Sequence, residues 1–181
     1  NSPKMNWLLQ KLKDIDKKQE KAIIFTELRQ VQAAIAFFIK KQFNLIPAIV
    51  NGESVNRQKT IDNFQAIIGF NIIILSPLAA GAGLNIVAAN HVIHFTRTWN
   101  PAKEAQATDR AYRIGQKKDV YVYCPTITHP QFETFEVKLD SLMKAKLDLA
   151  TDMLNGVGAD FSPFELVSVT NGLSESSYTL E

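Results

Sequence analysis

Two arginines stand three positions apart in the stretch QATDRAYRIGQ, residues 106–116. If the stretch is helical, Gln106, Arg110 and Arg113 leave the helix within about 60° of one another and share one face. Planar guanidinium groups match the charge that spreads over the oxygens of a transferring phosphoryl group. Taken alone, however, the spacing favours a solvated polar face, with Asp109 paired to an arginine of a neighbouring element.

The residues before this stretch predict where its helix begins. Asn100 can cap the helix, and Pro101 suits the first helical position, where its missing N–H is not needed. The helical pattern then continues through Arg113. We therefore expect one helix to carry Gln106 and both arginines.

A glycine-containing loop, SPLAAGAGLN at 76–85, directly follows an apolar run. Gly81 and Gly83 allow a close backbone approach to a phosphate or a ribose. A dinucleotide-binding fingerprint would need a third glycine at the position of Ile86, so that alternative fits poorly. As a bare glycine pair, the loop is more typical of an ordinary turn than of a binding site.

Short apolar runs alternate with helical patterns along most of the chain, which is typical of a parallel sheet with crossover helices. Each run is apolar nearly throughout, as a strand covered on both faces should be. Helical spacing is found over 28–43, and Ser54 is the expected N-cap of a second helix over 54–65. The predicted strands are 22–26, 46–50, 72–76, 91–96 and 120–124.

A long amphipathic pattern follows the last predicted strand. Its polar face carries Lys138, Lys144 and Lys146, which we interpret as solvated side chains. Beyond Gly156 the glycine, serine and asparagine content rises, so 156–181 is predicted to be a loosely attached tail. The apolar stripe of the predicted helix consists of Phe135, Leu139, Leu142, Leu149 and Met153.

Composition limits the class of protein. With 181 residues, of which 46% are apolar and 21% charged, the chain suits one globular domain, and its charge of +2 does not identify a nucleic-acid binder. The single cysteine, Cys124, excludes a disulfide framework and is expected to pack in the core. No signal peptide or membrane-spanning run is found, so we expect an intracellular protein without membrane partners.

Taken together, these stretches resemble the second RecA-like lobe of SWI/SNF-type, superfamily-two helicase-like ATPases, and most of all the bacterial branch. The resemblance covers about residues 20–147, and its most specific part is WNPAKEAQATDRAYRIGQ at 99–116. It implies an α/β fold, a RecA-like three-layer lobe with a central, mainly parallel sheet flanked by helices, plus a long C-terminal bracing helix. The implied domains are an N-terminal helix or linker (1–20), the lobe (21–130), the bracing helix (131–155) and the tail (156–181).

The resemblance also implies a double-stranded DNA translocase that holds ATP and Mg²⁺ in the cleft between two such lobes. Arg110 and Arg113 then correspond to the arginines that reach the nucleotide phosphates, with Arg113 as the finger on the γ-phosphate. Gln106 corresponds to the glutamine that helps organise the same cleft. All three are the expected catalytic residues.

Other matching positions would contact the nucleotide or the DNA. Gly83 and Asn85, with Gly81 beside them, correspond to the segment that approaches the ribose of the nucleotide. Ser76 corresponds to a hydroxyl that contacts a DNA phosphate. Arg57 matches a helix-borne arginine of the family, although a structural ion pair explains that arginine equally well.

Four residues depart from the family pattern. Leu78 stands where a basic residue is common, and Ala80 where glycine is usual, which weakens the DNA-side loop. Thr96 replaces an expected aspartate and Thr98 an expected tryptophan. A weakened or specialised motor would result from these changes.

Neither a GxxxxGK[ST] phosphate loop nor an acidic DExx motif occurs in the 181 residues. The chain therefore supplies half of an ATPase site and should be inactive as an ATPase by itself. Its expected partners are the N-terminal RecA-like lobe of a longer chain, from which this piece is cut, and double-stranded DNA. We expect a monomeric fragment, and a whole protein that works in the bacterial cytoplasm on the nucleoid.

Two other functions stay open. A non-catalytic module could use the same lobe to bind protein or nucleic acid, which the changes at Leu78, Ala80 and Thr96 favour and the intact arginine motif disfavours. An RNA helicase shares the lobe architecture, but the RIGQ and WNP stretches favour the duplex-DNA branch.

Overall fold

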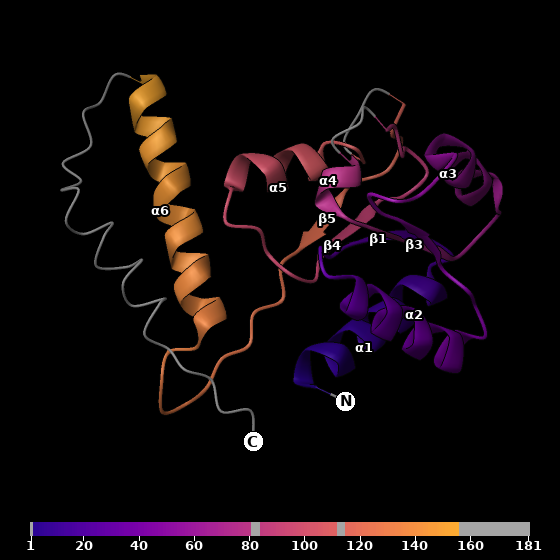
Figure 1. The fold of residues 1–181 in the computed structure, drawn as a ribbon, viewed down its shortest axis with the longest axis horizontal. Coiled ribbons are helices and arrows are strands. Elements are labelled where there is room, and N and C mark those ends of the chain that lie inside the picture. The colour runs from indigo at the N-terminus through magenta and orange to yellow at the C-terminus, as the bar shows by residue number, and fades with distance from the viewer. Residues whose placement is uncertain (1, 81–83, 112–114, 156–181) are drawn as a thin grey trace. The chain divides into compact units, whose positions relative to one another are not determined.

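The structure, a computed structural model, describes residues 2–80, 84–111 and 115–155 of the chain. The chain divides into two compact units, one made of residues 1–98 and 102–125 and the other of 99–101 and 126–181. The first unit contains the five strands that the structure describes, with helices on both sides of them (Figure 1).

Five parallel strands form one sheet in the spatial order β2-β3-β1-β4-β5. At its centre, Ile23 of β1 lies opposite both Ile73 of β3 and Val92 of β4. Burial on both faces explains the nearly continuous apolar runs. All five predicted strands are confirmed to within two residues at each end: β1 (Lys21–Phe25), β2 (Ala48–Val50), β3 (Asn71–Leu75), β4 (His91–His94) and β5 (Tyr121–Tyr123).

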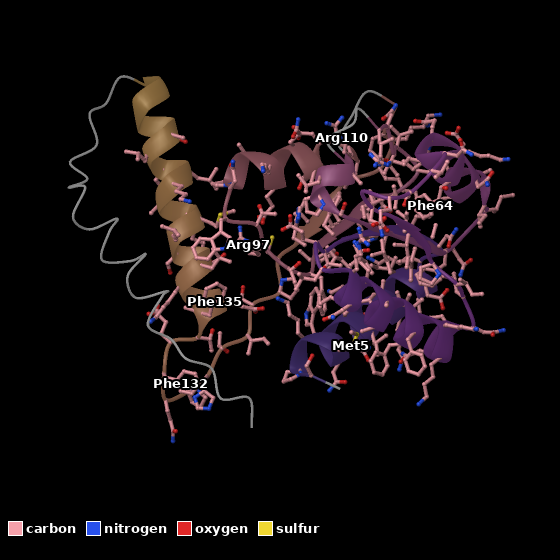
Figure 2. All side chains as sticks on the ribbon, viewed as in Figure 1. Met5, Phe64, Arg97, Arg110, Phe132 and Phe135 are labelled. Carbon is pink, nitrogen blue, oxygen red and sulfur yellow. The ribbon has the colours of Figure 1, made fainter. Side chains whose placement is uncertain are left out.

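Helices cover both faces of this sheet, namely α1 (Pro3–Lys17), α2 (Arg29–Phe43), α3 (Arg57–Ala66), α4 (Pro77–Ala80) and α5 (Pro101–Thr108). Ile24 belongs to the apolar core that α1 and α2 cover, and the next-door Ile23 to the core that α3, α4 and α5 cover. Figure 2 labels one residue of each core, Met5 of α1 and Phe64 of α3. The predicted three-layer α/β arrangement is confirmed.

The start of α3 differs from its prediction. Ser54 is not the N-cap, because the helix begins at Arg57 after Asn56, whose φ of 55° is left-handed. The Ser54 hydroxyl instead accepts a hydrogen bond from the Asn51 N–H at 2.9 Å. Serine oxygens compete for backbone donors in turns in this way, so Ser54 closes the turn after β2.

The second unit contains α6 (Phe135–Asn155), which confirms the long helix predicted there. Thr134 caps it, since its Oγ1 accepts a hydrogen bond from the Val137 N–H at 3.3 Å. The predicted tail lies outside the described residues. None of the described helices combines the length and apolarity needed to cross a membrane. The buried apolar residues of α6 are Leu139, Leu142 and Met143.

Candidate functional site

The carboxyl ends of the strands lie together at one edge of the sheet, because all five strands are parallel. Open parallel sheets bind their ligands at this edge. Ser76 directly follows β3, and Arg57 lies beyond the loop that follows β2. Asn85 and Arg110 lie in the segments that follow α4 and α5. We call the loops that directly follow the strands, those of Ser76 and Arg57, the carboxyl edge.

Arg110 follows α5 and is buried, with 5% of its surface exposed. Its Nε has no hydrogen-bond partner in the part of the chain that the structure describes. Buried charges are costly unless they are paired or hydrogen-bonded. A buried guanidinium with an open donor is therefore suited to an anionic ligand.

The burial of Arg110 results from the way α5 ends. The Asp109 N–H still bonds to a carbonyl four residues back, at 2.9 Å, but the N–H groups of Arg110 and Ala111 bond three residues back, at 3.2 and 3.0 Å. Each residue of such a tight turn rotates about 120° instead of about 100°. Arg110 thus faces inward while Gln106 is exposed.

Two expectations about the arginine stretch are therefore corrected. The start of α5 at Pro101 is confirmed, but the helix ends at Thr108 and does not continue through Arg110. Gln106 and Arg110 do not share one face. Arg113 lies outside the described residues.

Asn85 is the only one of the three predicted ribose-contacting residues that the structure describes, since Gly81 and Gly83 lie outside the described residues. Leu84 and Ile86 on either side are buried, so the alternation leaves Asn85 exposed. The Ile86 N–H donates to the Arg110 carbonyl at 3.0 Å. This bond brings Asn85 and Arg110, 25 positions apart in the sequence, to one place.

Ser76 is buried, and its hydroxyl accepts a hydrogen bond from the Ala79 N–H at 3.2 Å. Its own N–H donates to the Val50 carbonyl at 3.0 Å, which joins the ends of β2 and β3. Leu78, two residues on, is 65% exposed, so a basic side chain at this position would face solvent. The side chain of Ala80 lies outside the described residues.

Arg57 holds the loop after β2. Its Nη2 donates to the Gly52 carbonyl at 2.7 Å, and its Nε donates to the Ser54 carbonyl at 3.3 Å. These bonds go to backbone carbonyls and not to the carboxylate of an ion pair. Arg57 therefore shapes the loop beside Ser76, while Asn85 and Arg110 form a second group.

Sequence reasoning did not identify a chain of polar contacts between the strand ends. Gln32 Nε2 donates to the Thr26 carbonyl at 2.9 Å, and Asn51 Nδ2 donates to Gln32 Oε1 at 3.3 Å. The Thr96 hydroxyl donates to Thr26 Oγ1 at 3.0 Å. The sequence did hint at this contact, because Gln32 is a polar residue on the otherwise apolar buried face of α2.

An ion pair at the start of α5 was also not predicted from the sequence. Arg97 Nη2 and Nε donate to the two carboxylate oxygens of Glu104 at 2.7 and 3.3 Å. The two side chains are 13% and 10% exposed. Removing one partner of a buried pair typically costs about 3–5 kcal/mol, because the other charge is left uncompensated.

His94 lies in β4, next to the other end of α5. The Thr108 hydroxyl donates to the Glu104 carbonyl at 3.1 Å, so His94 Nε2 must carry the hydrogen of its 2.8 Å bond to Thr108 Oγ1. Burial lowers the pKa of His94 to about 4, against the raising effect of Glu104 and with the help of the Arg97 charge. His94 is therefore neutral at pH 7.

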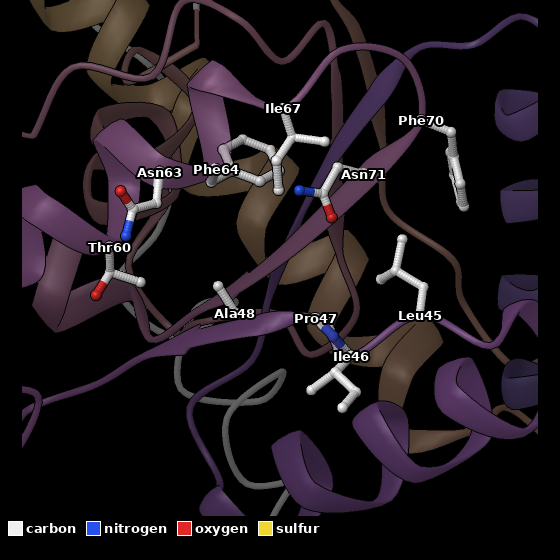
Figure 3. Close-up of a pocket in the computed structure, with 10 residues that line it drawn as sticks. All are labelled: Leu45, Ile46, Pro47, Ala48, Thr60, Asn63, Phe64, Ile67, Phe70 and Asn71. Atoms are coloured by element: carbon white, nitrogen blue, oxygen red, sulfur yellow. The ribbon is translucent and has the colours of Figure 1, made fainter.

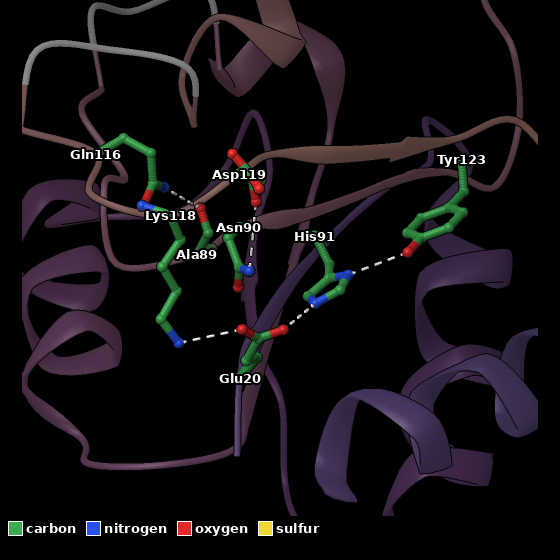
Figure 4. A network of polar contacts seen from close by, with 8 residues as sticks. All are labelled: Glu20, Ala89, Asn90, His91, Gln116, Lys118, Asp119 and Tyr123. Carbon is green, nitrogen blue, oxygen red and sulfur yellow. Dashed lines mark hydrogen bonds and ion pairs between the residues drawn. The ribbon is translucent and has the colours of Figure 1, made fainter. Parts of the chain in front are cut away.

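The amino-terminal edge of the sheet holds a separate polar network (Figure 4). Glu20 accepts hydrogen bonds from His91 Nε2 at 2.6 Å and Lys118 Nζ at 3.2 Å, and the Tyr123 hydroxyl donates to His91 Nδ1 at 3.2 Å. Burial acts to raise the pKa of Glu20, but hydrogen bonds from His91, Asn90 and Lys118 outweigh it and lower the pKa to about 2. Burial lowers the pKa of His91 more than Glu20 raises it.

Glu20, His91, Lys118 and Tyr123 are paired within this network, which gives His91 a structural role, whereas Asn90 Oδ1 has no hydrogen-bond partner among the described residues. In the described ranges no three His, Cys, Asp or Glu side chains are grouped as a metal site would need. A cavity of about 410 Å³ also lies away from the carboxyl edge (Figure 3). Its lining includes Ala48 and Asn71, the first residues of β2 and β3, so it opens at their amino ends.

The chain was compared with family models, with curated proteins and with solved structures. The family model described as "Helicase conserved C-terminal domain" matches residues 3–115. The chain is 52% identical over 173 residues to Zorya protein ZorD of Escherichia coli O139:H28 (strain E24377A / ETEC), a match that covers 89% of this chain. It is 39% identical over 150 residues to the putative ATP-dependent helicase/translocase YwqA of Bacillus subtilis (strain 168), covering 82% of this chain.

In each of these two relatives, the match spans 16% of the relative's length. Among solved structures, the C-terminal part of the Fun30 ATPase domain matches with a TM-score of 0.70 and 34% identity, over 78% of this chain and 45% of that one. The Sulfolobus solfataricus SWI2/SNF2 ATPase core in complex with dsDNA matches with a TM-score of 0.67 and 34% identity, over 93% and 35%.

The low pKa of His94 predicts acid sensitivity between pH 6.5 and pH 4. Between these pH values His94 is protonated in the unfolded chain but not in the folded chain. The free energy of unfolding therefore falls as the pH falls. His94 should contribute a loss of about 2 kcal/mol between pH 7 and pH 5. Urea unfolding at both pH values would measure this loss for the parent chain and for His94→Gln.

The variant His94→Gln cannot titrate, and its amide can still donate to Thr108. We expect a smaller pH dependence in the variant, while Glu20 titrates at lower pH and contributes little in this window. An identical loss in both proteins would contradict the assigned pKa of His94.

Proposed function

The chain belongs to the helicase C-terminal domains of SWI/SNF-type ATPases, and from this we propose that it acts as the second motor lobe of an ATP-dependent double-stranded DNA translocase. The RecA-like three-layer fold and the DNA-bound SWI2/SNF2 neighbour support the proposal. In it, the lobe supplies arginine fingers and contacts to the DNA backbone. The remaining part of a longer chain supplies the other lobe.

The observation that carries this proposal is the buried guanidinium of Arg110 with its unpaired Nε. A phosphate oxygen is the acceptor that best matches such a donor in charge and geometry. The hydrogen bond from the Ile86 N–H to the Arg110 carbonyl keeps the backbone of Arg110 close to that of Asn85, the residue assigned to the ribose. Both positions would then face the same nucleotide.

The chain's own contribution to the reaction is positive charge at the phosphates. Arg110 and Arg113 stabilise the charge of the transferring phosphoryl group, with Arg113 as the finger on the γ-phosphate and Gln106 helping to organise the cleft. ATP and Mg²⁺ would be held mainly by the first lobe.

On the DNA side, Ser76 would donate its hydroxyl hydrogen to a backbone phosphate, because its oxygen lone pair already serves the Ala79 N–H. Arg57 would support this contact by shaping the neighbouring loop. Such contacts position the protein without reading sequence. We further propose that the fragment is monomeric and that the whole protein acts in the bacterial cytoplasm on the nucleoid.

A non-catalytic binding module is the second candidate, and the exposed Leu78 favours it. In that case the fold would persist while the arginines contribute nothing to hydrolysis. The RNA helicase alternative would show as a preference for RNA over duplex DNA in stimulating ATP turnover. Loss of ATP turnover on replacing Arg113 would separate the translocase from the non-catalytic module.

Replacing Arg113 in the full-length protein tests the finger. Arg113→Ala should lower DNA-stimulated ATP turnover by about 10³–10⁵-fold, the usual effect of losing an arginine finger. Arg113→Lys should fail almost as badly, because an ammonium cannot reproduce the planar fork. Steady-state phosphate release with saturating duplex DNA would measure both effects.

Lys117→Ala is the matched control, since Lys117 is a nearby exposed cation. Its turnover and the melting temperatures of all three variants should stay close to those of the parent. Turnover that persists in Arg113→Ala, or that disappears only through unfolding, would leave Arg113 as a solvated side chain.

Leu78→Lys tests the weakened DNA contact. The exposed site allows a lysine to reach a phosphate, so DNA affinity of the full-length protein should rise at low salt, and the slope of log K against log salt should steepen by about one. Leu78→Gln removes the same apolar side chain without adding charge and serves as control. Equal salt slopes in both variants would place residue 78 away from the DNA.

A further inference from the structure

We propose that Arg97 is a positioning residue for ATP hydrolysis, acting through its ion pair with Glu104. This inference rests on the proposed function, because it concerns the place of the guanidinium of Arg110. Arg97 lies in the segment that leaves β4, and Glu104 lies on α5. Figure 2 labels Arg97 and Arg110.

The geometry of the pair favours a fixed orientation over a loose attraction. Two nitrogens of Arg97 meet the two oxygens of Glu104, at 2.7 and 3.3 Å, and only 13% and 10% of the side chains are exposed. Two parallel bonds define an angle between the groups as well as a distance. The start of α5 is thereby fixed relative to the segment after β4.

The same carboxylate-bearing residue is connected to the far end of α5. The Glu104 carbonyl accepts a hydrogen bond from Thr108 Oγ1, which in turn contacts His94 of β4 at 2.8 Å. From Thr108 and its neighbour Ala107 onward, the tight turn sets the direction of Arg110. A rotation of α5 at Glu104 therefore moves Arg110.

Exposed ion pairs elsewhere in the chain do not have this arrangement. Arg29 and Glu53, at 61% and 72% exposure, join the first residue of α2 to the loop after β2, and Lys17 and Asp14 lie on one helix. Pairs of this kind contribute little, since solvent screens them. Burial and the connection to Arg110 distinguish the pair of Arg97 and Glu104.

The test uses the full-length protein with Arg97→Gln, Arg97→Lys and the double variant Arg97→Gln/Glu104→Gln. The double variant leaves no lone buried charge, so it stays folded if Arg97→Gln does not. For each variant, kcat per folded molecule should fall by about 10–100-fold while the KM for ATP changes less than about threefold, since misplacing a catalytic group slows the chemical step. Lys17→Gln serves as the control that keeps the parent's kcat.

A second readout separates positioning from simple loss of structure. Affinity for ADP with aluminium fluoride, which mimics the transferring phosphoryl group, should weaken by about the same factor as kcat, while affinity for ADP alone should not change. A merely structural pair would reduce the folded fraction and leave kcat per folded molecule intact. That result, or equal weakening of both ligands, overturns the proposal.

Failure of the proposed function and failure of the role of Arg97 would give different results. If the full-length parent shows no DNA-stimulated ATP turnover, the proposed function fails. If the parent is active and all three variants keep its kcat per folded molecule, only the role of Arg97 fails.

Discussion

Burying the guanidinium of Arg110 with an open Nε is costly, because a charge that leaves water needs partners to replace its hydration. Two backbone features fix the position of Arg110. The tight turn after Thr108 directs the side chain inward, and the Ile86 N–H holds the Arg110 carbonyl. A group held in this way is ready for an anion before the anion arrives, which is what electrostatic stabilisation of phosphoryl transfer requires.

The first unit contains two kinds of polar structure. At the amino-terminal edge, Glu20, His91, Lys118 and Tyr123 satisfy one another, and hydrogen bonds hold the pKa of Glu20 at about 2. In the segment after α5, Arg110 keeps an Nε without a hydrogen-bond partner among the described residues. The first network stabilises the fold, and the second leaves a place for a ligand.

The sequence predicts the five strands well because strands buried on both faces are apolar throughout, a pattern that short runs such as AIIF and NIIIL display. It also predicts the start of α5, because Pro101 acts locally. The end of α5 could not be predicted: no glycine or proline occurs between Thr108 and Gly115, and contacts with His94 and Ile86 accompany the turn there. These contacts come from distant parts of the chain.

In the candidate site, too, some features follow from the local sequence and others depend on contacts between separate segments. Asn85 lies exposed between buried neighbours, as a local pattern can suggest, whereas the pair of Arg97 and Glu104 joins residues on either side of a helix start. Hydrophobic periodicity carries no information about such a pair. Ser54 was wrongly predicted to cap a helix. Serine is a common N-cap residue, but the Ser54 oxygen accepts a hydrogen bond within a turn. Arg113, Gly81 and Gly83 stay predictions, outside the described residues.

We propose that this chain holds one half of an ATPase site. It is tested most directly by measuring phosphate release from ATP by the isolated 181-residue chain and by the full-length protein, each with and without duplex DNA. We expect no turnover above buffer for the isolated chain, because its 181 residues contain no GxxxxGK[ST] phosphate loop, and DNA-stimulated turnover for the full-length protein. Turnover by the isolated chain that survives further purification, or a full-length protein that DNA does not stimulate, would contradict it.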